Sequence, residues 1–114
     1  MKVYSYKGCG TCQKALKYLE AKKVKYELLA IREQPPTVPE LERMLAYYEG
    51  DLKRLFNTSG LDYKALNIKD KLPKLSVKEA LVLLSRNGNL VKRPFVLTPY
   101  GGVVGFKPDE WARL

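Results

Sequence analysis

The sequence predicts an α/β protein, a mixed sheet of about four strands with a helical insertion between a βαβ half and a ββα half. Three observations support this fold class. A strand-like, a helical and a second strand-like segment open the chain (1–31), helical patterns fill residues 37–88, and two short strand-like segments precede a final helix start (94–114). No internal repeat or low-complexity tract divides the 114 residues, so we expect one domain spanning 1–114.

The opening segments predict a βαβ unit. Residues 2–6 are strand-like, and a helix is expected from near Gly10 to Lys23, with its apolar residues on one face. Residues 24–31 then predict a second strand. A strand, helix and strand of this length favour a right-handed parallel crossover.

Two capping boxes mark helix starts in the insertion. Glu40 follows Thr37, and Glu79 follows Ser76, at the spacing that lets each side chain satisfy a backbone N–H of the other residue. The first helix is expected to end at Gly50, and the second at residues 87–88. Shorter helical pieces are expected at 51–56 and 63–66, with a turn at 57–60.

The last segments predict two strands and a helix. Residues up to Thr98 have strand composition after Pro94, the glycine-containing loop 99–102 follows, and residues 103–106 are again strand-like. Pro108 suits the first turn of a terminal helix. This order of elements fits a thioredoxin-like sheet with a helical insertion.

Both cysteines lie between the first strand and the first helix, in the sequence Cys9-Gly10-Thr11-Cys12. A spacing of three places them one helical turn apart, within reach of a disulfide. Cys9 is expected at or just before the N-cap, where free N–H groups and the helix dipole stabilise a thiolate. Lys7 and Lys14 add positive charge on either side.

Three other interpretations compete with a redox pair: a structural disulfide, a shared metal site, or two buried thiols. A disulfide closing so short a loop stabilises weakly. A zinc site needs two more ligands, and the chain has no histidine and no third cysteine. A CxxC after a strand and opening a helix favours the redox interpretation, so we expect neither metal nor cofactor.

The charge balance limits the classes of partner without choosing one. The net charge is +9, from 21 Lys and Arg against 12 Asp and Glu. The basic residues are spread along the chain and form no recognition helix, so we expect no direct DNA binding. The chain begins with a charged, strand-like segment and has no apolar run long enough to span a bilayer. We therefore expect a cytoplasmic protein that does not bind membranes.

The pair Arg93-Pro94 precedes the third predicted strand. Most X–Pro bonds in folded proteins are trans, but in a thioredoxin-like arrangement the proline that opens this strand is commonly cis and faces the reactive cysteine. The CxxC context therefore favours cis. Arg93 would then point toward the thiolate or a bound anion, for which its planar fork is suited.

Three stretches together resemble one known family. They are Y-x-x-x-C-G-T-C-Q-K-A near the start, L-F-N-T-S-G-L-D-Y-K-A-L in the middle, and R-P-F-V-L-T followed by V-G-F-K-P-D-E at the end. In this order they resemble the arsenate reductase (ArsC)/Spx-like family of thioredoxin-fold proteins, over essentially the whole chain.

The resemblance implies roles for several residues. In arsenate reductases that use glutathione and glutaredoxin, the cysteine matching Cys9 attacks arsenate and the arginine matching Arg93 holds the oxyanion. Asn57 stands about where those enzymes have another arginine, which weakens the case for arsenate as the substrate. Cys12 stands where they usually have serine, which implies that it resolves Cys9 through an intramolecular disulfide. The residues expected to bind the anionic substrate are Gly10, Thr11, Pro94 and Lys107.

Two functions are therefore compatible with the sequence. One is a thiol-disulfide oxidoreductase, restored by thioredoxin or by glutathione and glutaredoxin. The other is a redox-switched interaction module, because the Spx-like transcription regulators use CxxC as a switch and bind the C-terminal domain of the RNA polymerase α subunit.

Overall fold

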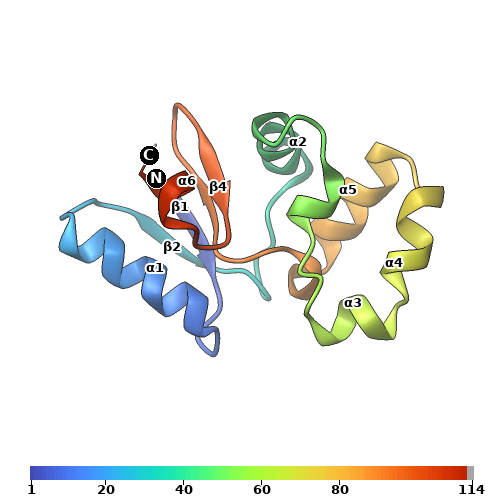
Figure 1. Cartoon of the computed structure of the whole chain (residues 1–114), viewed down its shortest axis with the longest axis horizontal. Helices are drawn as coiled ribbons and strands as arrows, with labels where there is room; N and C mark the ends of the chain where they lie inside the picture. Colours follow the sequence, from blue (N-terminus) through green and yellow to red (C-terminus); the bar gives the residue numbers. More distant parts are fainter. Residues whose placement is uncertain (113–114) are drawn as a thin grey trace.

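The computed structural model describes residues 1–112 and has the predicted α/β architecture (Figure 1). The chain starts with β1 (Lys2–Ser5), α1 (Gly10–Ala21) and β2 (Glu27–Ala30), and β1 pairs with β2 in parallel. The predicted βαβ unit is therefore present, with β2 shorter than the expected 24–31. No helix in this described part of the chain is long and apolar enough to cross a membrane.

The C-terminal half completes a four-stranded sheet of order β2-β1-β3-β4. Strands β3 (Phe95–Leu97) and β4 (Gly102–Val104) are antiparallel, and β3 also pairs antiparallel with β1. Helix α6 (Pro108–Trp111) follows. The sheet is thus mixed, as predicted, although the last two residues of the predicted 94–114 unit lie outside the described residues.

The insertion is a series of short helices on one side of the molecule (Figure 1). Its two longest helices, α2 (Val38–Tyr47) and α5 (Val77–Arg86), begin at the predicted capping boxes, both of which form. The sequence analysis did not predict α4, whose N-cap residue Asn67 has a left-handed backbone (φ 53°). The remaining elements are η1 (Leu52–Leu55), α3 (Leu61–Ala65), α4 (Ile68–Lys71), η2 (Leu72–Lys74) and η3 (Gly88–Leu90).

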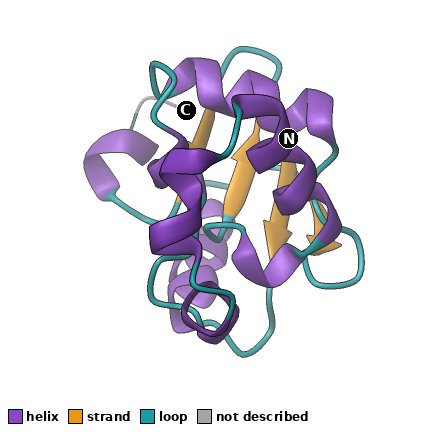
Figure 2. Ribbon diagram, turned by 90° about the vertical axis from the view of Figure 1, so that its right-hand side faces the viewer, coloured by secondary structure: helices purple, strands orange, loops and turns teal. Residues whose placement is uncertain are grey.

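The two faces of the sheet have separate hydrophobic cores, because successive strand residues point to opposite faces. Val3 of β1 packs with Ala15 and Leu19 of α1 and with Trp111 of α6. Its neighbour Tyr4 belongs to the larger core formed with the insertion. Figure 2 shows the strands running behind the helices of the insertion. The insertion is therefore packed on the sheet and forms one wall of any cleft between the two.

Gly88, at the end of the insertion, packs against the backbone just after β2. A Cβ atom added there would lie 1.8 Å from the carbonyl oxygen of Ile31. Real Cβ atoms do not approach backbone so closely, so this position requires glycine for packing. The glycine predicted to end a helix therefore also allows the end of the insertion to pack closely against the segment after β2.

Candidate functional site

Cys9 caps the N-terminus of α1. Its backbone is extended (φ −95°, ψ 113°), and its sulfur accepts a hydrogen bond from the Cys12 N–H, with 3.4 Å between the nitrogen and Sγ. The first turn of α1 contains no acidic residue. The N–H groups and the positive end of the helix dipole are therefore available to a thiolate at Cys9.

The surroundings of Cys9 favour its charged form. Burial by itself raises the pKa of the Cys9 thiol, but hydrogen bonds from Cys12 and Thr11 and the charge of Arg93 outweigh it. The net result is a pKa lowered from the ordinary value of 9.0. The thiolate is the nucleophilic form of cysteine, so this placement favours the form of Cys9 that could act as a nucleophile.

Cys12 has the opposite properties. Its side chain is buried, with 1% of its surface exposed. Burial first, and then the hydrogen bond and negative charge of Cys9, raise the pKa of the Cys12 thiol, although a backbone hydrogen bond with Tyr6 and, less strongly, the charge of Arg93 oppose this. Both cysteines are free thiols. The pair therefore combines a half-buried cysteine whose pKa is lowered with a buried cysteine, one helical turn away, whose pKa is raised.

Arg93 and Pro94, which precede β3, lie on the sheet side of the cysteine pair. We call Cys9, Cys12, Arg93 and Pro94 the reactive corner. The Arg93–Pro94 peptide bond is cis. The Arg93 guanidinium carbon lies 4.8 Å from the centre of the Tyr6 ring, and Arg32 contacts the same ring at 4.9 Å. Within residues 1–112, Nη1 of Arg93 is buried and has no hydrogen-bond partner. A buried, unpaired donor is costly, so this atom is suited to meet an anion that approaches Cys9.

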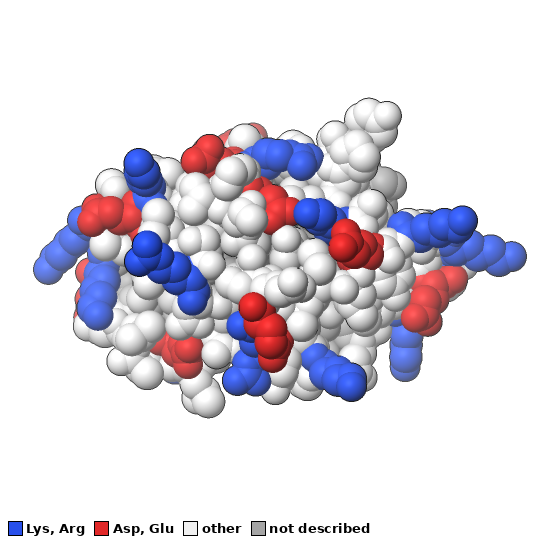
Figure 3. Space-filling view, turned by 180° about the vertical axis from the view of Figure 1, so that it is seen from behind, with Lys and Arg blue, Asp and Glu red and all other residues white. Residues whose placement is uncertain are grey.

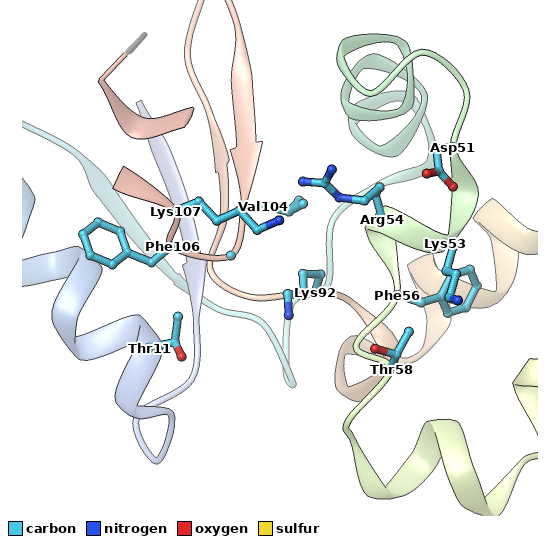
Figure 4. Close-up of a pocket in the computed structure, with 11 residues that line it drawn as sticks. Thr11, Asp51, Lys53, Arg54, Phe56, Thr58, Lys92, Val104, Phe106 and Lys107 are labelled. Atoms are coloured by element: carbon cyan, nitrogen blue, oxygen red, sulfur yellow. The ribbon is translucent and has the colours of Figure 1, made fainter. Parts of the chain in front are cut away.

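A cavity of about 410 Å³ opens beside α1, between the sheet and the insertion (Figure 4). Thr11 borders it from α1, and Thr58 from the insertion. Four cationic side chains also border it: Lys53 and Arg54 of η1, Lys92 before β3, and Lys107 before α6. We call this cavity, bordered by these six residues, the cationic cleft.

One wall of the cationic cleft is held in place by a hydrogen-bond network. Glu110 of α6 accepts bonds from the Tyr48 hydroxyl at 2.6 Å and from Arg54 at 3.2 Å. The Tyr48 oxygen in turn accepts the Val104 N–H at 3.0 Å. Burial, followed by Glu110, raises the pKa of Tyr48 to about 12, so the hydroxyl remains a donor. This network ties the insertion to β4 and α6 across the cleft.

The predicted site residues do not all lie together. Cys9, Cys12 and Arg93 are close enough to change one another's pKa values, and Thr11 supplies an N–H to Cys9. The hydrogen bonds that lower the pKa of Cys9 come from Thr11 and Cys12 rather than from Gly10, which begins α1. Lys107 borders the cationic cleft instead of contacting Cys9.

Sequence reasoning missed most of the cleft. Lys53, Arg54 and Lys92 were not predicted as site residues, and neither was Tyr6. Lys92 precedes Arg93 directly, and Lys53 and Arg54 are adjacent basic residues, but in a chain with a net charge of +9 neither pattern is distinctive. Within residues 1–112, no group of three or more His, Cys, Asp or Glu side chains is placed to hold a metal ion.

The fold and the reactive corner define a class of protein. A cysteine at the N-cap of the first helix, a second thiol in its first turn and a cis-proline before the third strand are placed on a four-stranded mixed sheet. These features define a protein of thioredoxin-like fold with a CxxC cysteine pair at the start of its first helix.

Comparison with known proteins identifies the family. The ArsC family model matches residues 4–114, and the chain belongs to the ArsC family. The Bacillus subtilis protein YusI is 44% identical over 108 residues, which cover 95% of this chain and 92% of YusI. The global transcriptional regulator Spx of Streptococcus pneumoniae is 30% identical over 103 residues, 90% of this chain and 76% of Spx.

A solved structure supports the same assignment. The crystal structure of an ArsC-family-related protein from Bacteroides fragilis superimposes with a TM-score of 0.92 and is 42% identical, covering 98% of this chain and 94% of that protein. The predicted resemblance to ArsC and Spx-like proteins and the predicted thioredoxin-like fold are confirmed.

Proposed function

We propose that this protein is a thiol-disulfide oxidoreductase in which Cys9 is the nucleophile and Cys12 the resolving thiol. The observation that supports it most directly is the position of the Cys9 sulfur at the N-cap of α1, 3.4 Å from the Cys12 nitrogen. Arg93 has the role of holding an anionic substrate and stabilising the thiolate. The Gly10 and Thr11 backbone, Pro94 and Lys107 complete the proposed substrate-binding set.

The reaction has two steps. The Cys9 thiolate attacks a disulfide R–S–S–R′, a Cys9–S–S–R bond forms, and R′S⁻ leaves and takes up a proton. Cys12 then loses its proton and attacks the Cys9 sulfur, which forms the Cys9–Cys12 disulfide and releases RS⁻. The substrate gains two electrons, and a thioredoxin or glutathione and glutaredoxin system returns two electrons to the protein.

The opposed pKa values suit these two steps. The charge of the Cys9 thiolate helps to keep Cys12 protonated, so the free enzyme has one nucleophile. When Cys9 enters a mixed disulfide, that charge is removed. Arg93, which lowers the pKa of Cys12, then acts on Cys12 without competition from the thiolate, and the second step becomes easier.

The test is turnover of a disulfide with a thiol-trapping analysis. Wild type should reduce the disulfide, and Cys9→Ser should not. Cys12→Ser should accumulate the mixed disulfide on Cys9, which mass spectrometry of trapped protein detects. Equal turnover by wild type and Cys9→Ser would contradict the proposal.

A second candidate is a redox-switched regulator, favoured by the 30% identity to a global transcriptional regulator. The resemblance to Spx-like proteins implies the C-terminal domain of the RNA polymerase α subunit as its partner. Binding of the purified domain should then differ between the dithiol and disulfide forms. Absence of binding in both forms would remove this candidate, whereas the disulfide turnover test is unaffected by it.

A further inference from the structure

The cationic cleft has more positive than negative side chains, and none of its cations is among the groups that shift the pKa of Cys9. Its four cationic side chains face only two carboxylates, those of Asp51 and Glu110. Within residues 1–112, neither Lys53 nor Lys92 takes part in an ion pair. The cleft therefore has an excess of two positive charges, and two of its lysines are not neutralised by the chain described.

Lys53, Arg54, Lys92 and Lys107 lie around one cavity. Figure 3, which views the molecule from behind Figure 1, shows basic and acidic side chains interspersed over that face. Figure 4 shows Lys92 and Lys107 reaching into the space between α1 and the insertion, opposite Thr58 and Arg54. The cleft thus combines several positive charges in a concave space, where they attract an anion more strongly than dispersed charges do.

The cleft and the nucleophile share a border. Thr11, whose N–H contributes to the low pKa of Cys9, also lines the cleft. On the sheet side, Lys92 lines the cleft and the next residue, Arg93, acts on Cys9. Cys9 itself does not line the cleft, so a molecule held there must extend past Thr11 to reach the reactive sulfur.

The types of cation indicate the chemistry of the ligand. Arg54, which could grip a planar carboxylate, is already bonded to Glu110 and lies 4.6 Å from the centre of the Tyr48 ring. Lys107 lies 4.0 Å from the same Glu110, so Lys53 and Lys92 are the cleft lysines without an ion pair among residues 1–112. An ammonium is a point charge of the kind that binds phosphate groups. Thr11 and Thr58 add hydroxyl groups, and about 410 Å³ is in the range of small-molecule sites.

From these observations we propose that the cationic cleft binds the phosphate groups of a small phosphorylated thiol, so that its disulfide is presented to Cys9. This inference rests on the proposed function, because it names the substrate class of the same reaction. The atoms and electrons balance as in the two steps above, with the phosphorylated thiol as RS. The phosphates remain unchanged and serve only for binding.

Rates with three disulfides test the proposal. Coenzyme A disulfide carries phosphates, glutathione disulfide carries carboxylates, and hydroxyethyl disulfide is uncharged. At equal ionic strength, wild type should have the highest kcat/KM for coenzyme A disulfide. In the double variant Lys53→Gln/Lys92→Gln, the ratio of kcat/KM for coenzyme A disulfide over hydroxyethyl disulfide should fall by about tenfold, as expected for about 1.4 kcal/mol of lost binding.

The matched control is Lys69→Gln, an exposed lysine of α4 outside the cleft. It removes one charge from the protein and should leave the ratio unchanged. An unchanged ratio in the double variant would overturn the proposal. An equal fall per charge in Lys69→Gln would also overturn it, because net charge alone would then explain the preference.

A binding measurement separates the failure of this inference from the failure of the proposed function. Titration calorimetry of Cys9→Ser with inorganic pyrophosphate requires no thiol chemistry. The triple variant Cys9→Ser/Lys53→Gln/Lys92→Gln should lose this binding and keep its melting temperature. That result would support phosphate binding in the cleft even if no disulfide is turned over. Absence of binding in Cys9→Ser, or equal binding in both proteins, would overturn the cleft proposal while leaving Cys9 chemistry intact.

Discussion

The three longest helices of this protein begin in two different ways. Helices α2 and α5 start with Thr37 and Ser76, each paired in a capping box with a glutamate three residues later. Helix α1 starts with Cys9 and has no acidic residue in its first turn. In α2 and α5, side chains of the capping box accept hydrogen bonds from backbone N–H groups at the helix N-terminus. In α1 the same N–H groups are directed at a sulfur that can ionise.

The difference shows how one local feature serves stability in one place and chemistry in another. A carboxylate at the third helical position satisfies donors and complements the dipole, but it would repel a thiolate. The absence of such a carboxylate from α1 therefore costs some stability and gains reactivity. Arg93 adds to this effect by lowering the pKa of Cys9. At the start of α2 the neighbouring cation, Lys2, is paired with the capping-box carboxylate of Glu40 instead.

The largest expected effect is that of Cys9→Ser. Serine is a better N-cap than cysteine, so the melting temperature should be unchanged or higher. The rate of disulfide reduction should fall at least about 10³-fold, because the nucleophile is removed. Steady-state kinetics and thermal unfolding measure both. A large loss of stability would show that the cysteine cap is needed for folding.

Moving a cysteine to the other kind of helix start sharpens the comparison. In a Cys9→Ser/Cys12→Ser background, Ser76→Cys places a thiol at the N-cap of α5, beside Glu79. We expect its alkylation by iodoacetamide at pH 7 to be at least about tenfold slower than that of Cys9 in Cys12→Ser, because the carboxylate disfavours the thiolate. Equal rates would mean that any helix N-terminus of this protein activates a thiol.

The variant Arg93→Gln tests how much the charge of Arg93, just before β3, lowers the pKa of Cys9. Its charge lowers the pKa of Cys9, so the variant should be alkylated about three- to tenfold more slowly at pH 7. Arg32→Gln is the matched control, because Arg32 also contacts the Tyr6 ring but is not among the groups that shift Cys9. If both variants slow alkylation equally, the effect comes from Tyr6 packing or net charge.

The smallest effects are expected at the two structural caps. Thr37→Ala and Ser76→Ala should each lower the free energy of unfolding by about 1 kcal/mol, measured by urea denaturation. Neither should change the alkylation rate of Cys9, since neither residue approaches α1 in the contacts described. A change in Cys9 reactivity with either variant would mean that the insertion controls the reactive corner through its own stability.

The sequence predicted the features that depend on local patterns. The capping boxes, the CxxC at the start of α1 and the proline before β3 all occupy the expected places, because their signals lie within a few residues of one another. The strands were predicted longer than they are, since β propensity extends beyond the residues that find pairing partners. Helix α4 was missed because its start at Asn67 has no cap pattern.

The cationic cleft could not be predicted in this way. Its walls come from η1, from the segment before β3 and from the segment before α6, which are far apart in the chain. Only the packing of the insertion on the sheet brings Lys53 to the same cavity as Lys92 and Lys107. The role of Tyr48 and Glu110 in tying the two sides together likewise depends on tertiary structure.

The pH dependence of Cys9 alkylation tests the central claim most directly. Wild-type protein in the dithiol state is treated with iodoacetamide at a series of pH values, and mass spectrometry locates the modified residue. The rate follows the thiolate fraction, so it rises with pH and levels off above the pKa of the group. We predict modification of Cys9 before Cys12, with an inflection below the ordinary thiol value of 9.0. An inflection at or above 9.0, or earlier modification of Cys12, would contradict the account.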